Sequence, residues 1–412
     1  MNASGDEPTS SMSAAIRVCF VIDRLSRAGT ESQLLLLLKQ LDRERIEPYL
    51  CLLDGHDETS LSLLPPDCPT LRLGVRRLAS LHAAKQAWKF WRFLRRQRID
   101  IVQTYFPDST RFAAPIAKAA GVRAVFGSRR NIGHWMTKRD ARIARFYNRL
   151  FIDKIIANCD AARQSAIEQE GAKPDQVIVV PNAIDLDRFK DIPPWQPKPH
   201  GQPRKVGMVG NLRPVKGVDL FIRAAKQVLK KFPDTQFEVA GGGDPTPYQA
   251  LIDELGLTDN VRLLDEVVDI PAFLATLDVA VLPSRAEGFS NALLEYMAAG
   301  RPIVATDVGG NAEVLGLMAA ECCVPSGDHL MLANRIQRVL EDRDHAALLV
   351  NAAHDRVTRT LRSPSLHDLY EEALKRSERV PLPIRMCHPA IAKRFRCSVL
   401  ALFWSLTTRD EL

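Results

Sequence analysis

The sequence predicts an α/β protein built from two similar, doubly wound halves, and three observations carry this prediction. Short apolar, β-branched segments alternate with helix-length segments along most of the chain, which is the pattern of parallel sheets. Residues 190–205 contain five prolines and no apolar periodicity, as linkers do. A second strand–helix series begins after this stretch. The length of 412 residues is enough for two such cores.

The strands of each half follow from short apolar runs. In the first half, the strand at 16–22 precedes a turn and a leucine-rich helix from about 32 to 41. The resulting division is a disordered segment 1–15, a first domain 16–190, a linker 191–205, a second domain 206–362, a helix 363–378 and a basic, apolar tail 379–412. The further strands are expected at 48–53, 99–103, 124–128, 154–157, 177–180, 206–209, 237–240, 261–264, 279–282 and 303–306.

Composition excludes several classes of protein. The chain is 46% hydrophobic and 25% charged, and it has no apolar run long enough to span a bilayer. Residues 1–15 carry acids in place of a basic leader region, so no secretory signal is expected. The eight cysteines lack metal-binding spacing and are expected to be free thiols in a reducing compartment.

The most informative segment runs from Glu287 to Glu295. It follows the apolar strand 279–282, and Ser290 or Asn291 is suited to cap the helix after it. A helix that begins at the carboxyl end of a parallel strand attracts anions. Two glutamates that flank such a site suit a ligand with phosphate in the middle and hydroxyl groups at both ends, such as a nucleotide sugar.

A glycine-bearing loop opens the second half, from Val209 to Gly217. It carries Arg213 and Lys216 between the first strand of this half and a helix expected at 218–231. Arginine offers a planar fork for phosphate oxygens and lysine a point charge. Both loop cations are therefore expected at the same anion site as the Glu287 segment.

These motifs together resemble glycosyltransferase family 4. The resemblance rests on 209–217, on the Glu287–Glu295 pair, on 295–313 and on the Pro181–Asp185 segment. It implies a GT-B fold: two Rossmann-like domains with a cleft between them, and a C-terminal helix that returns to the first domain. It also implies a retaining enzyme that uses a nucleotide-activated sugar.

The resemblance implies roles residue by residue. Arg213 and Lys216 would hold the donor diphosphate and, with Glu287, form the catalytic set. Glu287 would contact the transferred sugar, and Glu295 the ribose hydroxyls. The remaining donor contacts of this segment would be Gly288, Phe289, Ser290, Asn291 and Ala292. Because fixed cations and a helix N-terminus can stabilise the charge of the departing diphosphate, neither a metal nor a resident cofactor is expected.

The first half departs from the family pattern. Gly29 and Thr30 stand in the turn after the first strand, where the family brings backbone close to donor phosphate, but Ala28 stands where a second glycine is common. Many members carry a histidine after the strand 124–128, where this chain has Arg129 and Arg130. Arg130 and His134 are therefore candidate contacts to acceptor or phosphate, and whether a histidine acts stays open.

Basic residues concentrate in the first half. Between residues 72 and 149, 19 Lys or Arg stand against three acids. The segments Arg76–Arg98 and His134–Arg149 mix these cations with aromatic residues, as helices at an anionic membrane surface do. The alternative is that Trp88, Trp91 and Leu94 are core contacts and the cations a solvated face. No nucleic-acid-binding motif appears.

The predicted function is a metal-independent hexosyltransferase, cytoplasmic and peripheral on the inner face of the cell membrane. It would move a hexose from a UDP- or GDP-sugar to a glycan or lipid-linked glycan in surface polysaccharide biosynthesis. Two alternatives stay open: a sugar-nucleotide epimerase or phosphorylase of the same fold, and a catalytically silent glycosyltransferase-like binding subunit.

Overall fold

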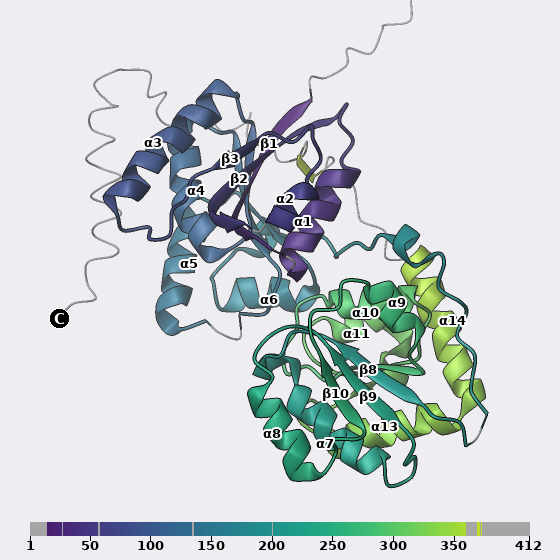
Figure 1. Ribbon diagram of the computed structural model, residues 1–412. Helices are drawn as coiled ribbons and strands as arrows, with labels where there is room; N and C mark the ends of the chain where they lie inside the picture. Colours follow the sequence, from purple (N-terminus) through teal and green to yellow (C-terminus); the bar gives the residue numbers. More distant parts are fainter. Residues whose placement is uncertain are drawn as a thin grey trace, which may run out of the picture. The chain divides into compact units, whose positions relative to one another are not determined.

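The computed structural model describes residues 15–26, 28–56, 58–133, 136–199, 201–359, 369–370 and 372. The expectations for residues 1–14 and for the 379–412 tail lie outside these residues. The described chain forms two compact units. The first contains residues 15–128, 146–155 and 369–372, and the second contains 129–145 and 156–359 (Figure 1).

A seven-stranded sheet has the order β3-β2-β1-β4-β5-β6-β7. Its inner strand β1 pairs in parallel with β2 and β4, and Val18, Phe20 and Ile22 are fully buried. Such strands are apolar on both faces because helices cover both faces. The strands are β1 (Ile16–Leu25), β2 (Ile46–His56), β3 (Thr70–Arg72), β4 (Ile101–Thr104), β5 (Ala124–Arg129), β6 (Lys154–Ala157) and β7 (Val177–Val179).

Helices cover the first sheet on both sides: Figure 1 shows α1 and α2 on one face and α3 and α4 on the other. The helix α3 begins at a Ser80 cap, whose Oγ accepts from the Ala83 amide at 3.0 Å. The helices before β8 are α1 (Gly29–Gln40), α2 (Glu58–Ser62), α3 (Leu81–Arg96), α4 (Pro107–Ala120), α5 (Lys138–Leu150) and α6 (Asp160–Glu168), with 3-10 turns at Pro174–Gln176 and Leu186–Phe189.

The C-terminal helix returns to the first unit, as predicted. Tyr370 is fully buried there, and its ring meets Phe126 edge-on at 5.3 Å. Its hydroxyl donates a hydrogen bond to Oε1 of Gln103 in β4. The rest of the expected 363–378 helix, apart from Leu369 and Glu372, lies outside the described residues.

The second unit contains a six-stranded sheet with the order β10-β9-β8-β11-β12-β13. All five pairings are parallel. The order reverses at β8, so the loops after β8 and β11 leave the same edge of the sheet, where doubly wound sheets bind ligands. The strands are β8 (Lys205–Val209), β9 (Gln236–Ala240), β10 (Val261–Leu264), β11 (Val279–Leu282), β12 (Ile303–Thr306) and β13 (Cys323–Val324).

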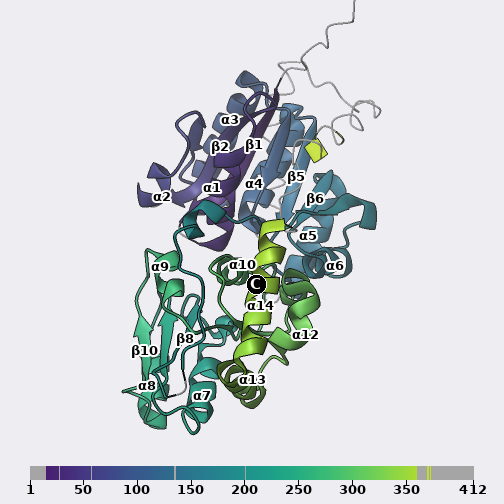
Figure 2. The same ribbon diagram turned by 90° about the vertical axis from the view of Figure 1, so that its right-hand side faces the viewer.

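The core of this unit joins the sheet to helices on both faces. Phe221 of α7 and Phe237 of β9 are fully buried, with their rings 5.6 Å apart. Figure 2 shows the long helix α14 running beside α10. The helices are α7 (Val218–Val228), α8 (Thr246–Leu255), α9 (Ile270–Ala275), α10 (Asn291–Ala298), α11 (Asn311–Leu315), α12 (Ala319–Cys322), α13 (His329–Glu341) and α14 (Arg343–Arg359), with 3-10 turns at Pro214–Lys216 and Gly316–Met318.

The Pro-rich stretch before β8 belongs to the second unit and packs beside the start of β11. The indole of Trp195 donates to the carbonyl of Asp278 at 3.1 Å, and the Lys198 ammonium contacts the Asp278 carboxylate at 2.6 Å. The same carboxylate accepts from the Lys205 amide at 2.7 Å. One nearly buried acid at the start of β11 therefore holds the chain as it enters β8.

Two sequence expectations need correction. The helix expected from residue 32 begins at Gly29, so Gly29 and Thr30 are its first residues and not part of a turn before it. The helix expected to reach residue 231 ends at Val228. Within the described part of the chain, no helix is both long enough and apolar enough to cross a bilayer.

Candidate donor-binding site

The loop after β8 is held close to the end of β11 by a glycine. Gly217 has φ +68°, and a Cβ placed there would lie 2.0 Å from the carbonyl oxygen of Pro283. Only glycine fits this approach and accepts this backbone conformation without strain. The short 3-10 turn Pro214–Lys216 precedes it, with Arg213 as its N-cap residue.

This close approach brings Lys216 to Glu287. The Lys216 ammonium lies 2.7 Å from Oε1 of Glu287, and the Ser284 hydroxyl donates to the same oxygen at 2.6 Å. The Glu287 side chain is 9% exposed and that of Lys216 30%. Both bonds end on Oε1, and Oε2 of Glu287 has no hydrogen-bond partner among the residues that the structure describes.

Arg213 differs from Lys216 in its surroundings. It is exposed, and its guanidinium makes no ion pair or hydrogen bond within the described ranges. A planar guanidinium without a partner is well suited to bind phosphate oxygens in a two-pronged contact. The loop thus presents one unpaired cation and one cation shared with a carboxylate.

The helix α10 begins next to this loop, as predicted. Ser290 is its N-cap, with its hydroxyl accepting from the Leu293 amide, and Asn291 is its first residue. The loop before it is packed by glycines: a Cβ on Gly309 would lie 1.9 Å from the Glu287 carbonyl oxygen, and the Gly310 amide donates to the Gly288 carbonyl at 2.9 Å. The positive end of the α10 dipole therefore faces the same region as the loop cations.

Asn182 connects Arg130 with the α10 segment, all within the second unit. Its amide donates to the carbonyl of Phe289 at 2.9 Å and to Oδ1 of Asn291 at 2.6 Å. Its own Oδ1 accepts from the Arg130 guanidinium at 2.6 Å. Asn182 is 5% exposed, so this network supports the backbone around Gly288, whose own Cβ position would lie 2.4 Å from the Arg130 carbonyl oxygen.

Replacing Asn182 by alanine is expected to lower the free energy of unfolding by about 1–3 kcal/mol, because buried partners are left unsatisfied. Urea denaturation of the full chain measures this change. Asn260→Ala is the matched control, because Asn260 also donates to two backbone carbonyls, at 3.3 and 3.2 Å, but in a more exposed position. Equal losses in the two variants would contradict the supporting role of Asn182.

Glu295 lies one turn further along α10. It is partly buried, and its carboxylate has no hydrogen-bond partner within the described chain. Burial raises the pKa of its carboxyl from 4.5 to about 7, and the charge of Arg188 offsets part of this rise. A carboxyl whose pKa is near 7 and whose oxygens lack a polar partner is suited to form a hydrogen bond with a ligand hydroxyl.

The raised pKa of Glu295 predicts a pH dependence of stability. Between about pH 4.5 and 7 the folded chain keeps a proton that the unfolded chain has lost, so the free energy of unfolding falls as pH rises through this window. The total is about 3 kcal/mol for a shift of this size. Glu295→Gln cannot ionise and should lose less stability than the parent between pH 5 and 8. Parallel pH profiles of the two proteins would contradict the assignment.

The structure gives only the location and burial of the other predicted contacts. Gly29 and Thr30 belong to the first unit, where they open α1. His134 lies outside the described residues. Phe289 and Ser290 are buried, while Ala292 is partly exposed on the first turn of α10. Within the described ranges, no group of three or more His, Cys, Asp or Glu is arranged to hold a metal, and metal independence stays a prediction.

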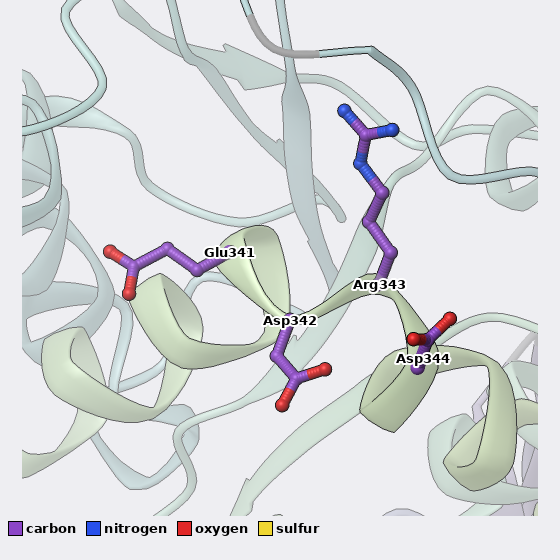
Figure 3. A pocket seen from close by; sticks show the side chains of 4 residues that line it. All are labelled: Glu341, Asp342, Arg343 and Asp344. Carbon is purple, nitrogen blue, oxygen red and sulfur yellow. The ribbon is translucent and has the colours of Figure 1, made fainter.

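A surface hollow of about 540 Å³ lies elsewhere, at the junction of α13 and α14. It is lined by Glu341, Asp342, Arg343 and Asp344, whose side chains point in different directions (Figure 3). Because the charged groups do not converge, this hollow offers no defined ligand geometry. It shares no residue with the predicted donor contacts.

Sequence reasoning missed three supporting residues. Asn182 was recognised as part of a motif but not as a contact of α10. Ser284 was not singled out, although its hydroxyl donates a hydrogen bond to Oε1 of Glu287. The Tyr296 hydroxyl accepts from the Val209 amide at 2.7 Å and donates to the Val281 carbonyl at 3.2 Å. For Tyr296 the sequence carries one signal. It is a tyrosine among the apolar residues of a buried helix, and a buried tyrosine hydroxyl needs a polar partner.

Comparison with known families covers most of the chain. The family model described as "Glycosyltransferase Family 4" matches residues 27–188, and the one described as "Glycosyl transferases group 1" matches residues 203–342. Together the two matches extend over well more than half of the sequence. Residues 189–202, which include most of the Pro-rich stretch, separate them.

Two relatives show the range of similar enzymes. A D-inositol 3-phosphate glycosyltransferase of Salinispora arenicola is 30% identical over 223 residues, which cover 49% of this chain and 50% of that protein. A UDP-Gal:alpha-D-GlcNAc-diphosphoundecaprenol alpha-1,3-galactosyltransferase of Escherichia coli is 27% identical over 264 residues, 59% of this chain and 66% of that protein. The chain spans about half the length of the first curated relatives it matches.

Solved structures establish the fold. HepE of Anabaena, in complex with UDP and glucose, has a TM-score of 0.75 and 21% identity, with 88% of this chain and 100% of that chain covered. At this identity the similarity shows the architecture alone. The architecture is the GT-B fold, with its two parallel sheets, as predicted.

Proposed function

The chain belongs to the glycosyltransferases described by the group 1 and family 4 models, and we propose that it is a retaining hexosyltransferase that uses a UDP- or GDP-sugar. The acceptor is a glycan or lipid-linked glycan in surface polysaccharide assembly, at the inner face of the cell membrane. The E. coli relative, whose name includes a diphosphoundecaprenol-linked sugar, supports the choice of acceptor. The Anabaena structures with UDP and UDP-glucose support the choice of donor.

One observation carries this proposal: Arg213 and Lys216 lie on a loop that Gly217 holds against the end of β11, beside the N-terminus of α10. A sugar–diphosphate bond breaks when its electron pair leaves with the diphosphate, so the transition state gains negative charge there. Fixed cations and a helix dipole stabilise that charge. They do so without reorganising during the reaction.

The bond between C1 of the sugar and the diphosphate oxygen breaks, and the acceptor hydroxyl oxygen bonds to C1 on the same face. The acceptor proton passes to the departing diphosphate. Lys216 and Arg213 hold the diphosphate, and Oε2 of Glu287, the oxygen that neither Lys216 nor Ser284 contacts, accepts a hydrogen bond from a sugar hydroxyl. Glu295 holds the ribose.

Nucleotide release from a panel of UDP- and GDP-sugars, with and without glycan acceptors, tests the proposal. We expect turnover with one donor class, loss of turnover in Glu287→Ala, and an unchanged anomeric configuration in the product. An epimer formed without acceptor, or sugar 1-phosphate formed from inorganic phosphate, would identify one of the alternative enzymes. Absence of nucleotide binding by calorimetry would identify a silent subunit.

A further inference from the structure

The helix α3 presents two chemically different faces. Ala83, Ala87, Phe90 and Leu94 are buried in the first unit, so this face belongs to the core. The opposite face is basic. Its cations are all exposed and follow the helical spacing along one side; they are Lys85, Lys89, Arg92, Arg95 and Arg96. We refer to these five cations and Trp88 as the α3 outer face.

None of these five cations forms an ion pair with an acid in the part of the chain that the structure describes. Lys89 and Arg95 contact only backbone carbonyls, at 3.3 and 3.4 Å. Other cations of the same unit are neutralised, as Lys118 is by Asp153 at 2.5 Å. Five like charges on one face repel one another, so an anionic partner would stabilise them.

Aromatic residues lie among these cations. Trp88 and Trp91 stack with their ring centroids 4.8 Å apart and an interplanar angle of 9°, and the Trp91 indole donates to the Ala119 carbonyl at 3.3 Å. Trp88 is 36% exposed, and Leu81 at the start of the helix is 85% exposed. A shallow groove of about 770 Å³ runs between the two rings and the basic side chains.

These features fit a lipid surface better than a discrete phosphate. The N-terminus of α3 is already capped by Ser80, and no helix of the described chain begins at a residue that lines the groove. Long basic side chains around partly exposed tryptophans are what an interfacial helix presents, with charges at the headgroups and rings at the acyl boundary. We propose that the α3 outer face binds the surface of a membrane that contains anionic lipids.

The choice of a membrane as partner rests on the proposed function at the inner face of the cell membrane. The test measures vesicle binding and not sugar transfer, so the two proposals can fail separately. The full chain is sedimented with vesicles of phosphatidylcholine alone and with vesicles that also contain phosphatidylglycerol. Binding to the anionic vesicles only is expected, weakening as salt rises. Equal binding to neutral vesicles, or no binding to anionic ones, would overturn the inference.

A charge variant places the binding on α3. The triple variant Lys85→Gln, Arg92→Gln, Arg96→Gln should bind anionic vesicles about a hundredfold more weakly, at roughly fivefold per charge. Trp88→Ala should also weaken binding. The matched control is Arg223→Gln, Lys230→Gln, Arg262→Gln, which removes three exposed cations of the second unit and should leave vesicle binding unchanged.

Two further measurements test whether the triple variants are folded and whether the anionic partner is a nucleic acid. Circular dichroism melting shows whether each triple variant folds like the parent, which is expected because all six side chains are exposed. Titration with a 20-base-pair DNA duplex tests the rival anionic partner. Vesicle binding that is equal in the two triple variants, or duplex binding tighter than vesicle binding, would contradict the proposal.

Discussion

Alanine in place of Lys216 should lower kcat/KM for the nucleotide sugar by about two to three orders of magnitude. Loss of one fixed group that stabilises developing charge has an effect of about this size in other enzymes. Lys216 is also the cation that neutralises Glu287 at 2.7 Å. Its removal therefore leaves a nearly buried carboxylate, still bonded by Ser284 but without its cation, next to an incoming diphosphate.

Steady-state kinetics with saturating acceptor measure the Lys216 effect. Lys226→Ala is the matched control, because Lys226 is an exposed lysine of α7 whose ammonium contacts the Leu255 carbonyl and pairs with no acid of the described residues. Lys216→Arg keeps the charge and should retain more activity than the alanine variant. An alanine variant as active as the Lys226→Ala control would exclude Lys216 from the reaction.

Alanine at Gly217 should reduce both stability and donor binding. Its Cβ would lie 2.0 Å from the Pro283 carbonyl oxygen, and no rotamer change relieves a clash with backbone. The left-handed conformation adds a cost of about 1–2 kcal/mol, and the overpacking a similar amount, so a loss of about 3 kcal/mol or more is expected. Relief of the clash moves the loop that carries Arg213 and Lys216.

Gly256 provides the control for this substitution. Its φ is +64°, close to the +68° of Gly217, but a Cβ there meets no atom within 4 Å. Gly256→Ala therefore carries the conformational cost without the clash. Urea unfolding and UDP titration of both variants measure the difference. Equal unfolding midpoints, or normal UDP binding by the Gly217 variant, would show that the close approach does not position the loop.

Most strands could be predicted because they are continuous apolar runs. The strands at 261–264, 279–282 and 303–306 begin and end where the sequence predicts. The two strands that were missed, β3 and β13, are short edge strands of their sheets. Polar residues flank Leu71 in β3, and β13 has only two residues. Neither forms an apolar run like Val177–Val179 of β7, the edge strand that was predicted.

Helix boundaries were less predictable where no cap marks them. Ser290 is a strong capping residue, and the start of α10 was predicted to within one residue. Ala28, the N-cap residue of α1, makes no capping hydrogen bond, and Gly29 is a poor helix former. The sequence rules therefore placed the start of α1 three residues late.

The candidate site also contains features that the sequence predicts and contacts that it does not. Loop glycines, cations and the α10 cap are local features, and the sequence predicts them as a group. The contacts of Asn182 join residues 107 and 109 positions apart, and no local pattern encodes such a pair. The sharing of Glu287 Oε1 between Lys216 and Ser284 likewise depends on how the β8 and β11 loops fold together.

The central claim is that the Arg213–Lys216 loop and the α10 N-terminus bind the diphosphate of a nucleotide sugar. The most direct test is calorimetric titration of the full chain with UDP, GDP and the matching nucleosides, in the presence of EDTA. We predict that one diphosphate binds at least tenfold more tightly than its nucleoside, and that Lys216→Ala removes most of this difference. Nucleoside and diphosphate binding with equal affinity, or a difference that survives in Lys216→Ala, would contradict the claim.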